Sequence, residues 1–311
     1  MMKNYLLKIV LFGLPVMVFP LLVLLIDPYN FVNAFHVVND SDKYKVIQRC
    51  DESSPRGNLL WKMICYKRQP LPCIIIGDSQ GKDIRTDLIA DITGETYSNL
   101  CVPGASYNTM FDLFWFAAAQ TDLKKAWFQV SFMNFNTQRS YNLFCAADKF
   151  MKYPYLYFTT KVIYVDAFYN VAWAVTRNPQ LISKSYEFLP ENKMEELSRS
   201  RLHLFFDSYS YPDNFVEEFR KVSQYCDKQG IELNFIILPV YVEVDNYLEK
   251  VGLDEERAQF KSDIKALGHT IDLDSESPLK NSRLNFFDYF HPKKAVMDSL
   301  TIEVWSNCVL Q

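Results

Sequence analysis

The sequence predicts an α/β fold built on a parallel sheet and preceded by one amino-terminal transmembrane helix. Two observations predict this fold. Short apolar runs that suit buried strands alternate with amphipathic stretches that suit helices, a pattern typical of a parallel sheet covered on both faces. The first 26 residues are far more apolar than the remaining chain. With 311 residues, the chain is long enough to bury one sizeable core.

The amino-terminal segment contains eighteen uncharged residues from Ile9 to Ile26. As a helix they would span roughly 27 Å, close to the ~30 Å thickness of the hydrocarbon core. Lys3 and Lys8 precede the run, which favours a cytoplasmic amino terminus and an extracytoplasmic or periplasmic main domain. A cleaved signal peptide and a buried core helix are the alternatives, but no small-residue cleavage site follows the run. We therefore expect residues 1–26 to be a single-pass membrane anchor that is not cleaved.

The segments beyond the anchor follow in order. Residues 27–72 are polar and irregular and are expected to form a connector to an α/β domain over residues 73–311. Five apolar runs predict its strands: Cys73–Gly77, Thr96–Leu100, Ala126–Phe132, Leu233–Leu238 and His269–Leu273. Capping residues and proline predict its helices: one from Ser106 to about Gln120, one from Asp213 to Gly230, one over Asp254–Leu267, and one opened by Pro292.

The block of about residues 140–212 interrupts this alternation and is expected to be an aromatic-rich insertion. Lys161 and Asp166 break its apolar pattern, so a second membrane span is not expected. The preferred interpretation is one or two helices packed on the sheet. The alternative is a lid, or a wall of aromatic rings on which sugars could stack.

Composition excludes several classes of protein. Lys+Arg 33 against Asp+Glu 37 gives a net charge of −4, and no basic run is longer than a pair, so nucleic-acid binding is not expected. A hydrophobic content of 49% excludes a disordered chain. The cysteines and histidines lack zinc spacing, so we expect no metal and no cofactor. Cys50 and Cys65 flank a polar loop and would form a disulfide in an oxidising compartment.

Two short motifs at opposite ends of the chain carry the candidate chemistry. Gly77-Asp78-Ser79 follows the first predicted strand, at the carboxyl edge where open α/β sheets place their active sites. Asp288-Tyr289-Phe290-His291 supplies a histidine and a carboxylate three residues before it. A serine nucleophile needs a base and a third group that orients the base. Either motif alone could be a turn or a helix start, but together they predict one nucleophilic site.

These motifs, with Gly104 after the second predicted strand, resemble those of the SGNH/GDSL hydrolase superfamily. More narrowly, the chain resembles membrane-anchored members associated with O-acylation of polysaccharides. The shared features include Asp27-Pro28-Tyr29-Asn30 after the anchor and Pro103-Gly104-Ala105-Ser106 after the second strand. The resemblance covers roughly residues 5–136 and 213–308, and it implies a flavodoxin-like α/β/α sandwich, the SGNH hydrolase fold.

The resemblance also implies a Ser-His-Asp triad. Ser79 would be the nucleophile, His291 the general base and then acid, and Asp288 the residue that orients His291. The backbone N–H groups of Ser79 and Gly104 would line an oxyanion hole.

Two positions depart from the superfamily pattern. Gln80 replaces the leucine of the Gly-Asp-Ser-Leu form, at a position expected mostly to pack. The third oxyanion donor is an asparagine in a Gly-x-Asn-Asp block, and the corresponding segment here has no glycine. Asn134 and Asn136 are therefore both candidates for this donor.

The resemblance implies a serine-dependent O-acyltransferase, with acetyl as the expected acyl group. It would act on a cell-surface or secreted polysaccharide through an acyl-enzyme on Ser79. Its acyl donor could come through a membrane-bound O-acyltransferase, its acceptor would be a glycan, and the amino-terminal helix would hold it in the membrane. The alternatives are an anchored carbohydrate esterase or deacetylase of the same fold, and a non-catalytic SGNH-like partner in polysaccharide assembly.

Overall fold

The computed structural model describes residues 13, 18–49, 54–182 and 189–309, and it divides the chain into two compact units. Unit 1 comprises Met1–Cys65 and Cys145–Phe188, and unit 2 comprises Tyr66–Phe144 and Leu189–Gln311. Each unit therefore joins segments that are distant in the sequence.

Unit 2 contains a parallel sheet of five strands in the order β2-β1-β3-β4-β5. All five predicted strands are confirmed, with ends that differ by at most two residues: β1 Cys73–Ile76, β2 Tyr97–Asn99, β3 Lys125–Val130, β4 Glu232–Ile237 and β5 His269–Asp272. In the register, Ile75 of β1 pairs with Asn99 of β2 and Trp127 of β3. After β1 the chain forms β2 on one side of it, and it then forms β3 on the other side of β1. This order places a topological switch point between β1 and β3, where ligands of doubly wound sheets bind.

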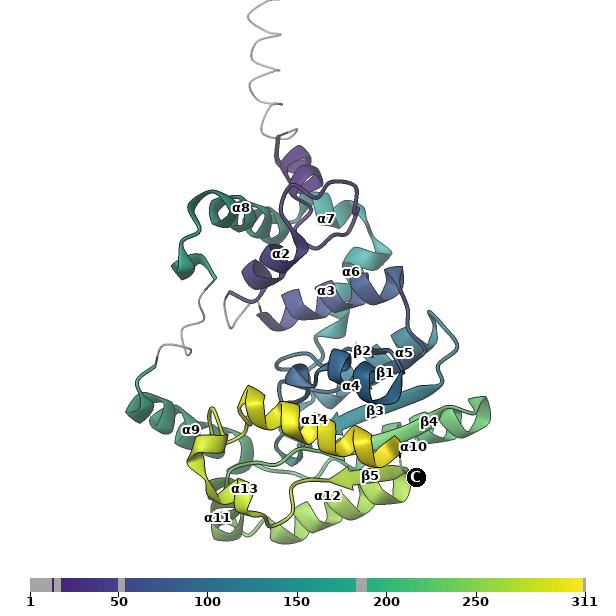
Figure 1. The fold of residues 1–311 in the computed structure, drawn as a ribbon, viewed down its shortest axis with the longest axis vertical. Helices are drawn as coiled ribbons and strands as arrows, with labels where there is room; N and C mark the ends of the chain where they lie inside the picture. Colours follow the sequence, from purple (N-terminus) through teal and green to yellow (C-terminus); the bar gives the residue numbers. More distant parts are fainter. Residues whose placement is uncertain (1–12, 14–17, 50–53, 183–188, 310–311) are drawn as a thin grey trace, which may run out of the picture. The chain divides into compact units, whose positions relative to one another are not determined.

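Alternate strand residues face two different helical layers. On one face, Ile75 and Trp127 pack in a core with Leu300 and Trp305 of α14 (Lys294–Val309). Figure 1 shows α14, in yellow, lying across the strands. On the other face, the ring of Phe128 lies 5.7 Å from Phe114 and 5.3 Å from Phe219, which belong to α5 (Tyr107–Ala118) and α10 (Asp213–Gln229). Unit 2 is thus a three-layer α/β/α sandwich.

The ends of two helices show how local sequence sets the fold. The side chain of Ser106 caps α5 by accepting a hydrogen bond from the Thr109 N–H, as predicted. The carboxyl-terminal helix begins at Lys294 rather than at Pro292. Pro292 forms a β-bridge with Phe286, and the N–H of Lys293 donates to the Asn285 carbonyl, so this segment is held before the helix starts.

The other helical segments of unit 2 connect the strands or cover their carboxyl ends. They are η1 Gly81–Asp83, α4 Thr86–Thr93, η2 Phe132–Asn134, η3 Thr137–Arg139, α9 Glu191–Phe206, α11 Val242–Val251, α12 Asp254–Leu267, α13 Pro278–Asn281 and η6 Arg283–Asn285.

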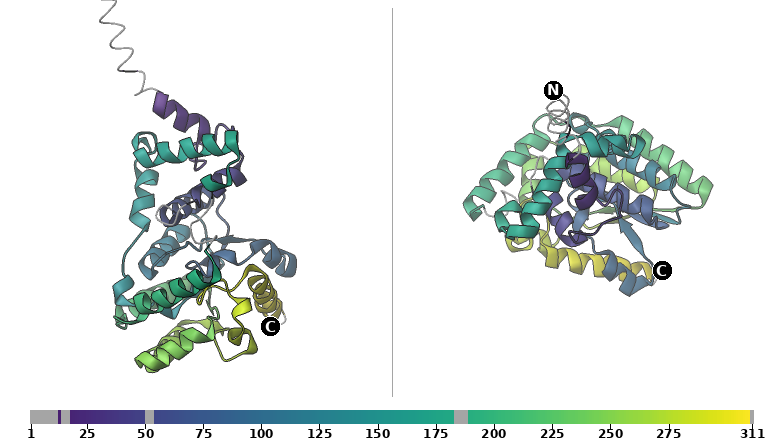
Figure 2. Two further views of the ribbon diagram at one scale, coloured as in Figure 1. Left: turned by 90° about the vertical axis from the view of Figure 1, so that its left-hand side faces the viewer. Right: turned by 90° about the horizontal axis from the view of Figure 1, so that it is seen from above.

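The described part of unit 1 is helical. Its helices are residues 18–26, α2 Asp40–Ile47, α6 Phe144–Lys152, α7 Tyr155–Thr159, α8 Lys161–Thr176 and η4 Pro179–Leu181, and α3 Ser54–Arg68 leads from unit 1 into unit 2. The expectation of an irregular connector over residues 27–72 is therefore wrong for α2 and α3. The polar α2 has its first turn capped by Asn39 and is stabilised by packing on α8, which periodicity does not reveal. Figure 2 shows these helices from two further sides.

The predicted anchor lies mostly outside the described residues, although residues 18–26 are helical. Among the residues that the structure describes, no helix has both the length and the apolar character needed to cross a membrane. Cys50 also lies outside them, so its pairing with Cys65 stays a prediction.

The aromatic block of residues 140–212 differs from the preferred interpretation. Its described residues, 140–182 and 189–212, contain four α-helices, of which α6, α7 and α8 group mainly with unit 1, while α9 belongs to the unit that holds the sheet. Asp166, which interrupts the apolar pattern of α8, is buried and accepts hydrogen bonds from the Tyr29 hydroxyl at 2.6 Å and from Arg49 at 2.6 Å. The carboxylate thus joins α8 to the amino-terminal segment within unit 1.

Candidate active site

The Gly77-Asp78-Ser79 turn follows β1 directly, at the switch point of the sheet. The turn packs tightly against β3, because a Cβ atom on Gly77 would lie 2.6 Å from Oε1 of Gln129 and 2.7 Å from its Cβ. The same Oε1 accepts a hydrogen bond from the Asp78 N–H at 2.9 Å. Glycine is therefore required at position 77 by close packing.

The structure brings Ser79, His291 and Asp288 together in one hydrogen-bonded chain. Ser79 Oγ lies 2.7 Å from Nε2 of His291, and Nδ1 of His291 lies 2.7 Å from Oδ1 of Asp288. Ser79 and His291 are half-buried, so the nucleophile can be reached from solvent. This arrangement has the geometry of a nucleophile, a base and a group that orients the base.

Asp288 is 1% exposed, and both oxygens of its carboxylate accept hydrogen bonds. Its Oδ1 accepts the N–H groups of Phe290 at 2.8 Å and His291 at 2.9 Å, and its Oδ2 lies 2.5 Å from a guanidinium nitrogen of Arg201. Burial alone would raise the pKa of Asp288, but the interactions with His291 and Arg201 outweigh it and hold the pKa well below its usual range. The carboxyl group is therefore ionised at neutral pH.

The backbone N–H groups of Ser79 and Gly104, the two that the sequence suggests for an oxyanion hole, have no hydrogen-bond partner among the described residues. Gly104 has φ 73°, a left-handed conformation that favours glycine. Its carbonyl, in the peptide that follows, accepts the Tyr141 hydroxyl at 2.7 Å. Both N–H groups therefore remain available to an oxyanion.

The structure distinguishes the two candidate asparagines. Nδ2 of Asn134 donates to Oδ2 of Asp78 at 2.5 Å, and its Oδ1 accepts from Nε of Arg139 at 2.7 Å, so Asn134 lies against the nucleophile turn. Asn136 instead donates to the Phe205 carbonyl at 3.0 Å and accepts the N–H of Gln138 at 3.0 Å. Asn136 thus binds backbone groups, and of the two asparagines it is Asn134 that contacts the Gly77-Asp78-Ser79 turn.

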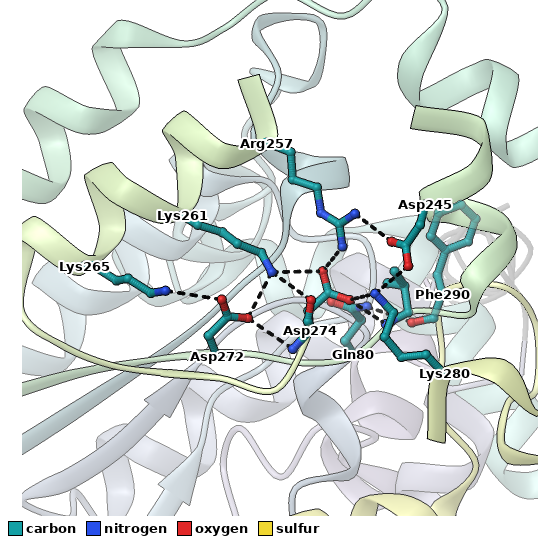
Figure 3. A network of polar contacts seen from close by, with 10 residues as sticks. Gln80, Asp245, Arg257, Lys261, Lys265, Asp272, Asp274, Lys280 and Phe290 are labelled. Carbon is teal, nitrogen blue, oxygen red and sulfur yellow. Dashed lines mark hydrogen bonds and ion pairs between the residues drawn. The ribbon is translucent and has the colours of Figure 1, made fainter. Parts of the chain in front are cut away.

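Gln80 does more than pack, contrary to the expectation from sequence. It is buried, its Nε2 donates to the Phe290 carbonyl at 2.7 Å, and its Oε1 accepts Nε2 of Gln129 at 3.0 Å. Figure 3 shows the Gln80 side chain directed at Phe290. The residue after the nucleophile is therefore tied to the residue before the base.

A buried ion cluster lies beside this contact (Figure 3). Asp274, after β5, pairs with Arg257 of α12 and with Lys280 of α13 at 2.8 Å, and Asp245 of α11 pairs with the same two cations at 2.6 and 2.7 Å. Lys280 is 3% exposed. These pairs attach α13, which leads into the loop that carries Asp288 and His291, to the helices beside it.

A cavity of about 20 Å³ lies beside the cluster, lined in part by Gln80, Phe290, Arg257 and Asp274 and not by Ser79 or His291. This volume holds about one water molecule. Within the described part of the chain, no group of three His, Cys, Asp or Glu side chains is placed to hold a metal ion.

The sequence did not single out the contacts of Gln80, Gln129 and Arg201. Gln129 offered a signal, because it is the one uncharged polar residue in the apolar run of β3. Arg201 offered none, since it lies in the block that matches no motif.

Comparisons with known proteins give limited information. No protein-family profile matches the chain, and no curated protein matches it significantly. Among solved structures, it is similar to a candidate platelet activating factor from Streptococcus pneumonia, at 10% identity and TM-score 0.40, over 81% of this chain and 92% of that one. It is also similar to a candidate lipolytic protein of the G-D-S-L family from Desulfitobacterium hafniense, at 11% identity and TM-score 0.39, over 76% and 97%.

A third similar structure is a candidate acylhydrolase from Bacteroides fragilis, at 11% identity and TM-score 0.40, over 79% of this chain and 96% of that one. TM-scores this low carry no weight for function. The case for function therefore rests on the geometry of the site.

Proposed function

We propose that the protein is a serine-dependent enzyme of acyl transfer with an SGNH-type site, in which Ser79 forms an acyl-enzyme. The continuous chain from Ser79 Oγ through His291 to Asp288, with both links at 2.7 Å, is the observation that carries this proposal. The contacts that hold Asp288, and the backbone N–H groups of Ser79 and Gly104 that have no partner among the described residues, support it further.

The mechanism follows from these atoms. Ser79 Oγ attacks the carbonyl carbon of an ester while His291 Nε2 takes the hydroxyl proton, and Asp288 orients the ring and stabilises its positive charge. The backbone N–H groups of Ser79 and Gly104 would stabilise the oxyanion, with the Asn134 amide as the third donor. His291 then returns the proton to the departing alcohol. A second hydroxyl compound, deprotonated by His291, releases the acyl group from Ser79.

For the second substrate, we propose a hydroxyl group of a cell-surface or secreted polysaccharide, and an acetyl group as the acyl unit. The resemblance of the motifs to membrane-anchored proteins of polysaccharide O-acylation supports this choice. Water in place of the sugar would make the enzyme an anchored carbohydrate esterase. The complete triad favours either enzyme over a non-catalytic assembly partner.

For location, we propose that residues 1–26 anchor the chain in the membrane, with the site on the extracytoplasmic side. The uncharged run from Ile9 to Ile26 after Lys3 and Lys8 supports this topology. The full chain should stay in the membrane fraction after a high-salt wash and keep an amino-terminal tag. A mature chain that begins beyond Ile26 would contradict the anchor.

The proposed chemistry is tested with p-nitrophenyl acetate as acyl donor, with and without an acetyl-free glycan. Transfer would be supported if the release of p-nitrophenol requires Ser79, is faster with the glycan and yields an acetylated glycan. If the release requires Ser79 but has the same rate with and without the glycan, the protein is an esterase. Equal rates for the wild-type protein and Ser79→Ala would reject the catalytic site.

A further inference from the structure

Helix α9 contacts both halves of the site, although it comes from the block of residues 140–212 that matches no motif of the superfamily. Within unit 2, Arg201 of α9 reaches Asp288. The ring of Phe205 lies 5.0 Å from that of Phe290, and the Phe205 carbonyl accepts the Asn136 amide at 3.0 Å. Because Phe290 directly precedes His291, α9 is packed against the segment that carries the base.

The two oxygens of the Asp288 carboxylate have different partners. Oδ1 faces His291 and the N–H groups of its own loop, whereas Oδ2 is paired with Arg201 at 2.5 Å. The Arg201 side chain is 29% exposed and that of Asp288 is 1% exposed. The guanidinium therefore occupies the outer edge of the carboxylate, between it and solvent.

This pairing has a physical consequence for the base. A charge-assisted hydrogen bond from a planar guanidinium restricts rotation of the carboxylate. A fixed carboxylate holds His291 in the tautomer and orientation that direct Nε2 at Ser79. Glu195 of α9 is engaged with Tyr289 and lies 3.7 Å from Arg283, so it does not compete for this position.

We propose that Arg201 is a positioning residue that acts through Asp288 on His291, as the fourth member of the chain Ser79–His291–Asp288–Arg201. This inference rests on the proposed function. It also gives α9 a role: the insertion completes the outer side of the triad.

The test measures how fast Ser79 reacts with a fluorophosphonate probe, which requires no knowledge of the natural substrate. Ser79 Oγ forms a bond to phosphorus, fluoride leaves, and His291 takes the proton. The proteins compared are the wild type, Arg201→Gln, Arg201→Lys and the control Arg220→Gln. Arg220 lies on α10, its side chain is 48% exposed, and it pairs with Glu217 of the same helix.

We expect Arg201→Gln to lower the maximal labelling rate by about 10²-fold, the effect of a small displacement of catalytic groups. The concentration of probe for half-maximal rate and the final fraction of labelled protein should stay unchanged. Arg201→Lys should recover part of the rate, because it keeps the charge, and Arg220→Gln should react like the wild type.

The outcomes separate this inference from the proposed function. A wild-type rate in Arg201→Gln would overturn the role of Arg201 while leaving Ser79 as the nucleophile. A lower final fraction labelled at an unchanged rate would overturn it as well, because it would show that Arg201 only maintains the fold. Absence of labelling at Ser79 in the wild-type protein would instead overturn the proposed function itself.

Discussion

Replacing Gln80 by leucine, the residue of the Gly-Asp-Ser-Leu form, should weaken both stability and catalysis. In this chain the Gln80 amide connects the nucleophile turn to the segment of His291. The change removes the bond of 2.7 Å to the Phe290 carbonyl and the bond of 3.0 Å from Gln129. Two buried polar groups, the Phe290 carbonyl and Nε2 of Gln129, would then lack these partners.

The magnitude follows from these two groups. Leaving a buried donor or acceptor unpaired costs about 1–3 kcal/mol, so the two together cost about 2–6 kcal/mol. Burial of a leucine side chain returns about 1.5–3 kcal/mol. At the midpoints of these ranges we expect a net loss of about 2 kcal/mol in the free energy of unfolding, with an upper limit of about 4.5 kcal/mol. The rate should fall by up to about 10²-fold, because the Phe290 carbonyl no longer fixes the distance between His291 and Ser79.

Urea unfolding would measure the stability, and the rate of reaction with p-nitrophenyl acetate would measure the catalysis of the folded protein. The control is Gln120→Leu, which makes the same chemical change at the end of α5, where the amide makes one weak bond of 3.3 Å to the Phe116 carbonyl. If Gln80→Leu were as stable and as active as Gln120→Leu, the bridge would have no role and the position would only pack.

Two further predictions concern the surroundings of the site. Gly77→Ala should destabilise the protein and slow acyl transfer, since the new Cβ would lie 2.6 Å from Oε1 of Gln129; retained activity and an unchanged unfolding midpoint would refute the packing argument. For Asp274, burial opposes ionisation, but Arg257, Lys280 and Lys261 outweigh it and lower the pKa below 3.8. Its stabilisation is therefore complete above the unfolded pKa and lost as pH falls through the folded pKa. Asp274→Asn should lower the free energy of unfolding by about 3–5 kcal/mol at pH 7. Urea unfolding at several pH values should show that this difference from the wild type becomes smaller below about pH 4. A difference that stays constant with pH would contradict a stabilising role of the ion cluster.

The central strands and the candidate site residues were predictable because their signals are local. Strand β1 is a run of four buried apolar residues, and sequence order fixes the turn that follows it. The spacing of Asp288 and His291 likewise places their side chains within reach of each other. The two motifs could therefore be identified as one candidate site without a structure.

The remaining features depend on contacts between distant segments, which a single sequence does not display. Helix α2 is polar and packs on α8, more than a hundred residues later, so its sequence resembled a loop. Arg201 lies 87 residues from Asp288, and its role depends on where α9 packs. Asn134 and Asn136 were equivalent in sequence and differ only because one amide faces Asp78 and the other faces Phe205.

The central claim, that Ser79 carries an acyl group during catalysis, is tested most directly by mass spectrometry of protein mixed with p-nitrophenyl acetate and quenched in acid. We predict an added acetyl group on the peptide that contains Ser79. It should accumulate when His291→Ala protein is allowed to react slowly, since this variant lacks the base for deacylation, and be absent from Ser79→Ala. Two results would contradict the account. In the first, the wild-type protein hydrolyses the ester but no acetyl group is found on Ser79 at any quench time. In the second, the same peptide of Ser79→Ala carries as much acetyl as that of the wild type.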